Sequence, residues 1–436
     1  MLLKKITILL ILGFSAADIS YASNSGPDIR YRSIVYFFPS KQEIDISALK
    51  NEFKSFELVE QLPNVTDSPV VSVSVINDVE NSFPVPDLSY LAYFGRGLDK
   101  QQANQIQKSN LALVIDVAYP VSLTFDGLKD ATISVFNFAN VSDGLIWDSE
   151  TRELYTPEAW KVKRIDSWID NIPEIEDHTV IHAYQNNEGV RAITLGMAKF
   201  GLPDIVVNDF SWSLNQSMGN LINLVAQSLA EGLVPDEQGY LLLNIKELKN
   251  IQYKSELLAT LKDNAETKVK IQIGDGKWED GDPYNYIIEL LFDDFDGASL
   301  SEKHESMLSS LFGWEDKISY VQHNQEIEAA SERAKRKLNS LRDDFNSGLS
   351  PGEFIQVKAP FTDLDGGNEW MWVEVQSWKG NVLQGLLKNE PRNIPDLKGG
   401  AKVTVNQADV FDYIRYYPDG TMDGNETGAL IRKYQR

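Results

Sequence analysis

One serine in the second half of the chain lies in a motif that is typical of nucleophilic catalysis. Gly348–Gly352 has the sequence Gly-Leu-Ser-Pro-Gly and fits the pattern G-x-S-x-G, in which a strand leads into the serine and a helix follows it. Here the order is reversed, because a helical pattern precedes the serine and a strand pattern follows it. Pro351 also lacks the backbone N–H that an oxyanion hole would use. We therefore expect Ser350 to lie in the turn that ends a helix.

Two further patterns resemble metal sites, but each lacks part of its ligand set. His178 and His182 are four residues apart, and the β-branched residues between them predict a strand, on which the two would lie ~13 Å apart. Asp419–Gly424 begins like a calcium loop, but a threonine occupies the third position and no acidic residue closes the loop. Asp363–Gly367 is incomplete in a similar way. We expect no bound metal.

The amino-acid composition excludes several catalytic mechanisms and leaves carboxylate-dependent hydrolysis open. The chain has no cysteine, which excludes thiolate nucleophiles, cysteine-bound zinc and disulfides. Neither of the glycine-rich patterns that bind phosphate groups occurs, so we expect no cofactor. The chain has 64 aspartates and glutamates, and a carboxylate-dependent hydrolase therefore remains an alternative. Only the separation of two carboxylates in space decides whether they can act together.

Aromatic residues near the C-terminus form the strongest candidate for a binding surface. Trp370, Trp372 and Glu374 share one face of a predicted strand, whereas the residues between them share the other. Packing in the core or between domains explains such a strand most simply. The other interpretation is an aromatic groove with an acidic rim that accepts a peptide or a cationic ligand. The candidate groove consists of Trp370, Trp372, Trp378, Glu369 and Glu374.

The elements that must position these residues are predicted from apolar periodicity. Between residues 30 and 250, strand patterns such as Leu111–Val117 alternate with helical patterns such as Leu214–Glu231. Val190–Phe200 is also predicted as a helix, which Gly201 ends. Gly144–Tyr155 is typical of a hairpin in which an Ile-Trp pair faces a Leu-Tyr pair across a polar turn.

A long helix and then a change of pattern mark the second half of the chain. Apolar residues recur at steps of three and four from Ile327 to Phe345, which predicts an amphipathic connector helix. Its apolar stripe is expected to pack against its own protein, and the alternative is a partner helix. Beyond Ser350, short strands separated by glycine, proline and asparagine predict a small β-rich domain. The predicted fold class is α+β, with an alternating α/β N-terminal region. The predicted domains are an N-terminal α+β domain (30–250), a middle α+β segment that ends in the long helix (251–348) and a β-rich C-terminal domain (351–436).

Several short blocks of the predicted C-terminal domain occur in the order in which they occur in a known family. The blocks are Val357–Phe361, Glu369–Val375, Gly385–Pro391, Gly399–Val403 and Asp412-Tyr413. This region, about one fifth of the chain, resembles the YegJ-like family of uncharacterised bacterial domains. The resemblance implies a bacterial source and a domain of unknown function. It implies no reaction, because the family has no established activity or catalytic residues.

The first 22 residues predict where the protein works. Lys4 and Lys5 precede the apolar stretch Ile6–Ala17, and Ser20–Ala22 places small residues where signal peptidase requires them, which is typical of a secretory signal peptide. The apolar stretch is much shorter than the ~20 residues that span a bilayer. We therefore expect a soluble, periplasmic or secreted protein that starts at Ser23 and does not insert into the membrane.

The net charge narrows the range of partners. At −23, the chain repels nucleic acids and anionic lipids, and no basic cluster offsets this charge locally. The acidity peaks between Asp275 and Glu305, which we attribute to solubility. The favoured prediction is a non-catalytic binding protein of the cell envelope whose partner is a protein or a peptide. The alternatives are the hydrolase and an acidic immunity-type protein that neutralises a cationic toxin.

Overall fold

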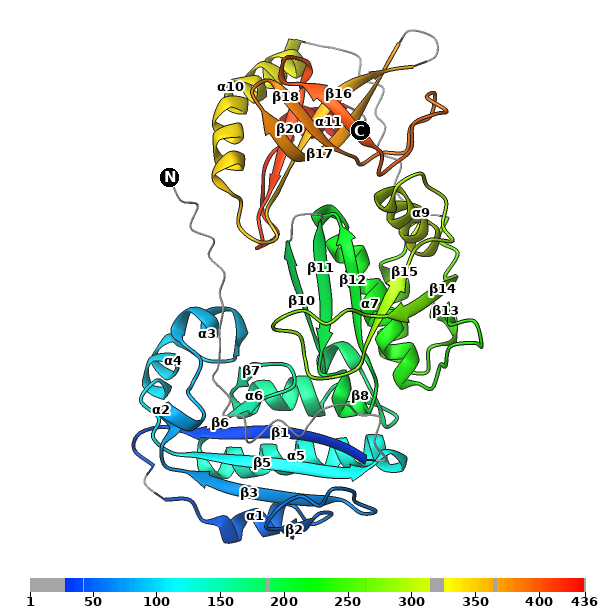
Figure 1. Ribbon diagram of the computed structural model, residues 1–436. Coiled ribbons are helices and arrows are strands. Elements are labelled where there is room, and N and C mark those ends of the chain that lie inside the picture. Colours follow the sequence, from blue (N-terminus) through cyan, green and yellow to red (C-terminus); the bar gives the residue numbers. More distant parts are fainter. Residues whose placement is uncertain are drawn as a thin grey trace. The chain divides into compact units, whose positions relative to one another are not determined.

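The computed structural model describes residues 28–41, 43–185, 189–262, 264–313, 325–363 and 367–434 (Figure 1). The predicted signal peptide lies outside these residues. No helix within them is both long and apolar enough to cross a bilayer. The α+β fold class is confirmed, because helices accompany sheets whose strands pair mainly antiparallel.

The chain forms two compact units, each built from several stretches of sequence. The first unit comprises the described residues up to Val180 together with Leu195–Asp204 and Trp278–Tyr286. The second comprises Ile181–Thr194, Ile205–Lys277 and the described residues from Ile287 onward.

The first unit is built around a seven-stranded sheet with the strand order β2-β3-β5-β1-β6-β7-β4. The central strand β1 pairs antiparallel with β5 on one side and with β6 on the other. The strands are β1 (Asp28–Phe37), β2 (Glu57–Val59), β3 (Val70–Ile76), β4 (Gly95–Arg96), β5 (Ala112–Pro120), β6 (Gly144–Asp148) and β7 (Glu153–Tyr155). The helices are α1 (Ile46–Glu52), α2 (Val79–Ser82), α3 (Leu88–Phe94), α4 (Lys100–Ile106), α5 (Thr124–Ser142) and α6 (Pro157–Trp160).

Helices cover both faces of this sheet. Ile34 of β1 packs in a cluster with side chains of α2, α3 and α4. On the other face, Phe37 meets Phe138 of α5 edge to face, with ring centroids 6.5 Å apart. Gly127 allows α5 to approach β5 closely, because a Cβ at this position would lie 2.6 Å from the Tyr119 ring. Burial on both faces explains why β5 and the second half of β1, Ile34–Phe37, have nearly continuous apolar sequences.

The structure confirms one local prediction in this region and corrects another. The strands β6 and β7 form the predicted hairpin, with Ile146 opposite Tyr155 and Trp147 opposite Leu154. The helix predicted over Val190–Phe200 is wrong. Its first half is a strand, and Gly196, with a φ of 108°, separates that strand from a short 3₁₀ turn.

A six-stranded sheet with the order β10-β11-β12-β15-β14-β13 follows. Strands from both sides of residue 250, where the sequence predicts a domain boundary, share this sheet. The strands are β10 (Val180–Gln185), β11 (Val190–Leu195), β12 (Asp204–Phe210), β13 (Tyr240–Asn244), β14 (Lys268–Asp275) and β15 (Ile287–Leu291). The accompanying helices are α7 (Asn215–Ala230), α8 (Ile251–Ala259) and α9 (Leu300–Phe312).

The β-rich C-terminal domain has a six-stranded sheet with the order β19-β18-β17-β16-β20-β21. The strands are β16 (Phe354–Thr362), β17 (Asn368–Lys379), β18 (Val382–Leu387), β19 (Lys402–Asn406), β20 (Asp412–Tyr416) and β21 (Met422–Gly424), and the helices are α10 (Gln325–Ser347) and α11 (Glu426–Tyr434). The predicted connector helix is α10. Its residues Ala334, Leu338 and Leu341 are buried in one cluster with Val357 and Val373 of the sheet.

Leu338→Asp should strongly destabilise the protein. Leu338 is 2% exposed, so the substitution removes apolar packing and places a carboxylate in the core, at a cost of about 3 kcal/mol or more. For a domain of this size, thermal unfolding monitored by circular dichroism should show a Tm lower by about 10 °C or more. Ser340→Asp is the matched control, because Ser340 is exposed on the same helix. An unchanged Tm in Leu338→Asp would show that the stripe is not packed.

Candidate functional site

The first candidate site is a group of charged side chains in the first unit, Asp148, Glu150, Glu153, Arg164 and Lys199, which we call the Asp148 cluster. Asp148 is the last residue of β6 and starts the turn of the hairpin. Its Oδ1 accepts the backbone N–H groups of Glu150 (3.0 Å) and Thr151 (3.3 Å), which is why an aspartate is favoured there.

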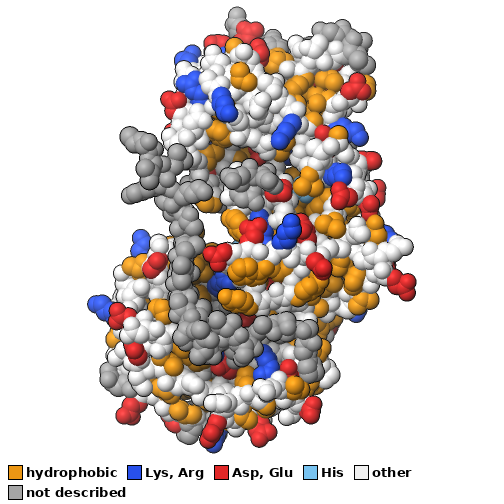
Figure 2. Space-filling view, viewed as in Figure 1, with side chains coloured by type: hydrophobic (Ala, Val, Ile, Leu, Met, Phe, Trp, Pro, Cys, Tyr) orange, Lys and Arg blue, Asp and Glu red, His pale blue; other side chains and the backbone are white. Residues whose placement is uncertain are grey.

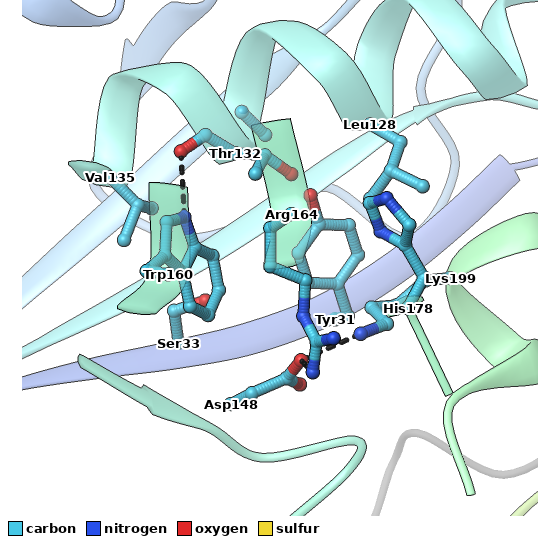
Figure 3. A pocket seen from close by; sticks show the side chains of 11 residues that line it. Tyr31, Ser33, Leu128, Thr132, Val135, Asp148, Trp160, Arg164, His178 and Lys199 are labelled. Carbon is cyan, nitrogen blue, oxygen red and sulfur yellow. Dashed lines mark hydrogen bonds and ion pairs between the residues drawn. The ribbon is translucent and has the colours of Figure 1, made fainter. Parts of the chain in front are cut away.

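Two cations from later parts of the chain reach the other carboxylate oxygen of Asp148 (Figure 3). Lys199 lies in the 3₁₀ turn η4 (Met197–Phe200), and its Nζ is 2.6 Å from Oδ2. Arg164 lies in the π-helical turn η2 (Lys161–Ile165), and its Nη2 is 3.2 Å from the same oxygen. All three side chains are at most 3% exposed. Each charge has lost most of its hydration and depends on the others for compensation.

Arg164 connects the cluster to its surroundings. Its Nη2 lies 3.3 Å from Glu153 Oε2 and donates to the Tyr155 hydroxyl at 2.7 Å and to Thr151 Oγ1 at 3.1 Å. The guanidinium also lies over the Tyr155 ring, 4.8 Å from its centroid. Arg96 pairs with the other oxygen of Glu153 at 2.6 Å. Positive and negative charges therefore alternate through the cluster.

Two carboxyl groups that interact with Lys199, those of Asp148 and Glu150, have pKa values shifted in opposite directions. Burial alone would raise the pKa of Asp148, but the positive charges of Lys199 and Arg164 outweigh it and hold the pKa well below its ordinary value. Removal from water, together with the negative charge of Asp148, raises the pKa of Glu150 to about 7. Burial lowers the pKa of Lys199, and Asp148 opposes that shift. Pairs of carboxyl groups whose pKa values are shifted in opposite directions also occur in acid–base catalysts.

A buried histidine lies beside the cluster. His178 is fully buried, and its ring meets Trp168 and Phe200 edge to face, with centroids 5.6 and 5.8 Å away. Within the described part of the chain, neither ring nitrogen has a hydrogen-bond partner. Burial and the positive charges of Arg164 and Lys199 lower the pKa of His178 well below its usual value, so the ring is neutral at pH 7.

The space between these side chains is a small cavity (Figure 3). Its lining includes Tyr31, Asp148, Arg164, His178 and Lys199, and all the lining residues are buried. The volume open to the centre of a water-sized sphere is about 10 Å³, which is room for about one water molecule. A sugar ring or a peptide does not fit. The cavity in the Asp148 cluster therefore has no room for the substrate of a hydrolase.

The three tryptophans of the candidate groove occupy different environments. Trp378 is 1% exposed, in the core of the C-terminal domain. A β-bulge between Val375 and Ser377 shifts the alternation of β17 and turns Trp378 toward the core face. Trp370 is half-buried and packs on the Phe411 ring, with centroids 4.6 Å apart. Trp372 is also half-buried.

The two glutamates of the candidate groove point into the protein. Glu369 is 4% exposed and accepts the backbone N–H groups of Arg392 (3.0 Å) and Asn393 (2.5 Å). Glu374 is 5% exposed and accepts a hydrogen bond from Ser211 Oγ at 2.5 Å. The expected acidic rim is therefore used for internal hydrogen bonds, and the structure does not bring the five residues together as one surface.

In the loop that resembles a calcium site, Asp419–Gly424, the two aspartates accept hydrogen bonds from protein groups. Asp419 Oδ1 accepts from the Thr421 backbone and hydroxyl (2.9 and 2.6 Å). Asp423 Oδ2 accepts from the Tyr413 hydroxyl at 2.8 Å. His182 lies in β10, whereas His178 precedes this strand. Within the residues that the structure describes, no group of three or more histidines and carboxylates is arranged to hold a metal ion.

A second candidate site was not predicted as one. Trp278–Tyr286, which we call the aromatic loop, belongs to the first unit. The exposed fractions of Trp278, Tyr284 and Tyr286 are 49%, 68% and 53%. Trp278 and Tyr284 stack with centroids 6.1 Å apart and planes inclined by 24°. The available signal was three aromatic residues among glycine, proline and aspartate, the residues of exposed turns.

Hydrogen bonds hold the backbone of the aromatic loop. Asp282, 4% exposed, accepts the Glu279 N–H at 2.8 Å, and its own N–H bonds to the Glu279 carbonyl at 3.0 Å. Arg152 Nη1 donates to the Gly281 carbonyl at 2.7 Å. The Asn285 amide donates to Asp204 Oδ2 at 2.8 Å. The loop therefore presents its rings from an ordered backbone.

His178→Phe and Glu150→Gln should change the acid stability in opposite directions. The pKa of His178 is lower in the folded than in the unfolded protein, so unfolding takes up a proton below about pH 6.5 and stability is lost as pH falls. The pKa of Glu150 is higher in the folded protein, at about 7, so its contribution to stability grows as pH falls toward about 4.5.

Calorimetry at about pH 7.5 and about pH 5 measures both effects. For each protein, the Tm at the lower pH is compared with the Tm at the higher pH. Relative to the unmodified protein, acidification should lower the Tm less in His178→Phe and more in Glu150→Gln. Each variant is the control for the other, because the two groups lie in the same region. A change of the same sign in both variants would contradict the opposite pKa shifts of His178 and Glu150.

Comparison with known proteins finds a family match for one part of the chain. Residues 324–434 match a family described as "Uncharacterized protein conserved in bacteria (DUF2314)". The match extends from α10 into α11. No curated protein and no solved structure was found to match the chain. The C-terminal region is therefore similar to a bacterial domain of unknown function, as predicted, and the narrower YegJ-like assignment stays a prediction.

Proposed function

We propose that this is an exported, non-catalytic protein of the bacterial cell envelope that binds another protein or a peptide. The single observation that carries the binding function is the exposed stack of Trp278 and Tyr284 on an ordered loop. Export rests on the signal-peptide pattern of residues 1–22, and the bacterial source on the family match.

The aromatic loop has the properties of a binding surface. Tryptophan and tyrosine dominate the energetic centres of protein interfaces. A side chain presented from an ordered backbone loses little conformational entropy on binding. The loop is better supported than the predicted groove, because its rings are more exposed and the groove's glutamates are buried. Trp372 of the groove is half-buried and offers less surface.

The two alternative functions, a hydrolase and an immunity-type protein, receive less support. The Asp148 cluster has shifted carboxyl groups but encloses room for only about one water molecule, which disfavours a hydrolase at this position. An immunity-type protein would present one acidic face to a cationic toxin. On the face seen in Figure 2, acidic side chains are scattered and basic ones lie among them.

Export predicts a defined N-terminus. The protein should fractionate with the cell envelope or the medium of the producing bacterium, because its first residues carry a signal-peptide pattern. N-terminal sequencing of this material should begin at or near Ser23. A mature chain that retains Lys4 and Lys5 would contradict export by cleavage.

The binding function predicts a site-specific crosslink. Replacing Tyr284 by the photoreactive residue p-benzoylphenylalanine keeps an aromatic ring at the centre of the aromatic loop. Irradiation of the producing cells should give a discrete adduct on a denaturing gel, and Trp278→Ala should weaken it, because the adduct depends on the stack. The matched control is the same replacement at Tyr93, which is 75% exposed and lies in α3. Equal adducts at both positions, or none at Tyr284, would contradict a binding site in this loop.

A further inference from the structure

We propose that the aromatic loop binds a cationic ligand, namely a peptide segment that carries lysine or arginine. This inference rests on the proposed function and names the chemistry of its ligand. The observation behind it is the combination of stacked, exposed rings with exposed carboxylates on one short loop.

The rings supply the first part of the recognition. The face of an indole or a phenol ring attracts a cation through its quadrupole, and tryptophan is the strongest of the aromatic side chains in this respect. Trp278 and Tyr284 are nearly parallel, so a cationic side chain or a guanidinium plane can lie on an outer face of the pair. Tyr286, which is 53% exposed, extends the aromatic surface of the loop.

The charges of the loop favour a positive ligand. Glu279 and Asp280 are exposed within the same loop. The buried Asp282 adds a third acidic residue, and Arg152, half-buried, is a cation that contacts the loop backbone. With a net charge of −23, the whole chain attracts cations over longer distances.

A neutral sugar is the principal competing ligand, because aromatic rings also stack on sugars. The exposed carboxylates and the negative net charge do not favour a neutral ligand over a cation, since they act through charge. A basic peptide uses both the rings and the carboxylates. The observations therefore favour the peptide, and the sugar serves as a competing probe.

The test uses the full protein labelled with ¹⁵N at its tryptophan indoles. The chain has nine tryptophans, and the Trp278 signal is assigned by its loss in Trp278→Phe. The probes are a capped six-residue peptide of alternating lysine and glycine, the same peptide with glutamine in place of lysine, and chitotriose. The lysine peptide should shift the Trp278 signal in a saturable way, and the other two probes should not.

Variants separate the two parts of the recognition. Tyr284→Ala and the double variant Glu279→Gln/Asp280→Asn should each weaken the apparent affinity for the lysine peptide about fivefold. Tyr93→Ala, which alters an exposed ring outside the loop, should leave it unchanged. Raising the salt concentration from about 0.05 M to about 0.5 M should weaken binding further, because exposed charges are screened.

Three results would overturn the inference: equal shifts with the glutamine peptide, a shift with chitotriose alone, or an unchanged affinity in the double variant. These results are distinguishable from failure of the proposed function. If the crosslink at Tyr284 forms but the lysine peptide does not bind, the loop binds a ligand of another class. If neither occurs, the loop is not a binding site.

Discussion

The assembly of the first unit depends on the balance of charge around Asp148. One oxygen of this carboxylate forms the hairpin turn, and the other receives Arg164 and Lys199. A buried ion pair contributes little net stability compared with apolar packing, but loss of one partner leaves an uncompensated charge at a cost of about 3–5 kcal/mol. We interpret the cluster as a constraint that selects one arrangement of the hairpin, η2 and η4, because other arrangements would leave a buried charge without its partner.

The same constraint explains why the groups with shifted pKa values are buried, whereas the proposed binding loop is exposed. Closing the Asp148 cluster removes water, which strengthens its ion pairs and shifts Asp148, Glu150 and His178 away from their ordinary pKa values. The cavity that remains has room for about one water molecule. The exposed aromatic rings lie on a loop that is held by hydrogen bonds to Arg152, Asp282 and Asp204, so the loop can present apolar surface from a fixed backbone.

The sequence predicts correctly those elements whose structure is determined by residues close to one another in the chain. The period of α10 and the facing pairs of the β6–β7 hairpin are set by neighbouring residues, and both were predicted correctly. The sequence predicts a helix in place of β11, because the positive φ of Gly196, which follows the strand, has no unambiguous signal in the sequence. The position of Trp378 depends on a bulge, and the burial of Glu369 depends on backbone N–H groups about twenty residues away. The buried Lys199 gave no local signal, because its partner Asp148 is remote in sequence.

The division of the chain has a consequence for how such a protein can evolve. Because the first unit takes its last segment, Trp278–Tyr286, from between two strands of the following sheet, no single cut in the gene separates the two units. Recombination at one junction would leave the first unit without Gly281 and Asn285, the hydrogen-bond partners of Arg152 and Asp204. Residues 324–434, in contrast, form one contiguous stretch of sequence. The C-terminal domain can therefore be exchanged between proteins as a cassette, whereas the two halves of the remainder must be inherited together.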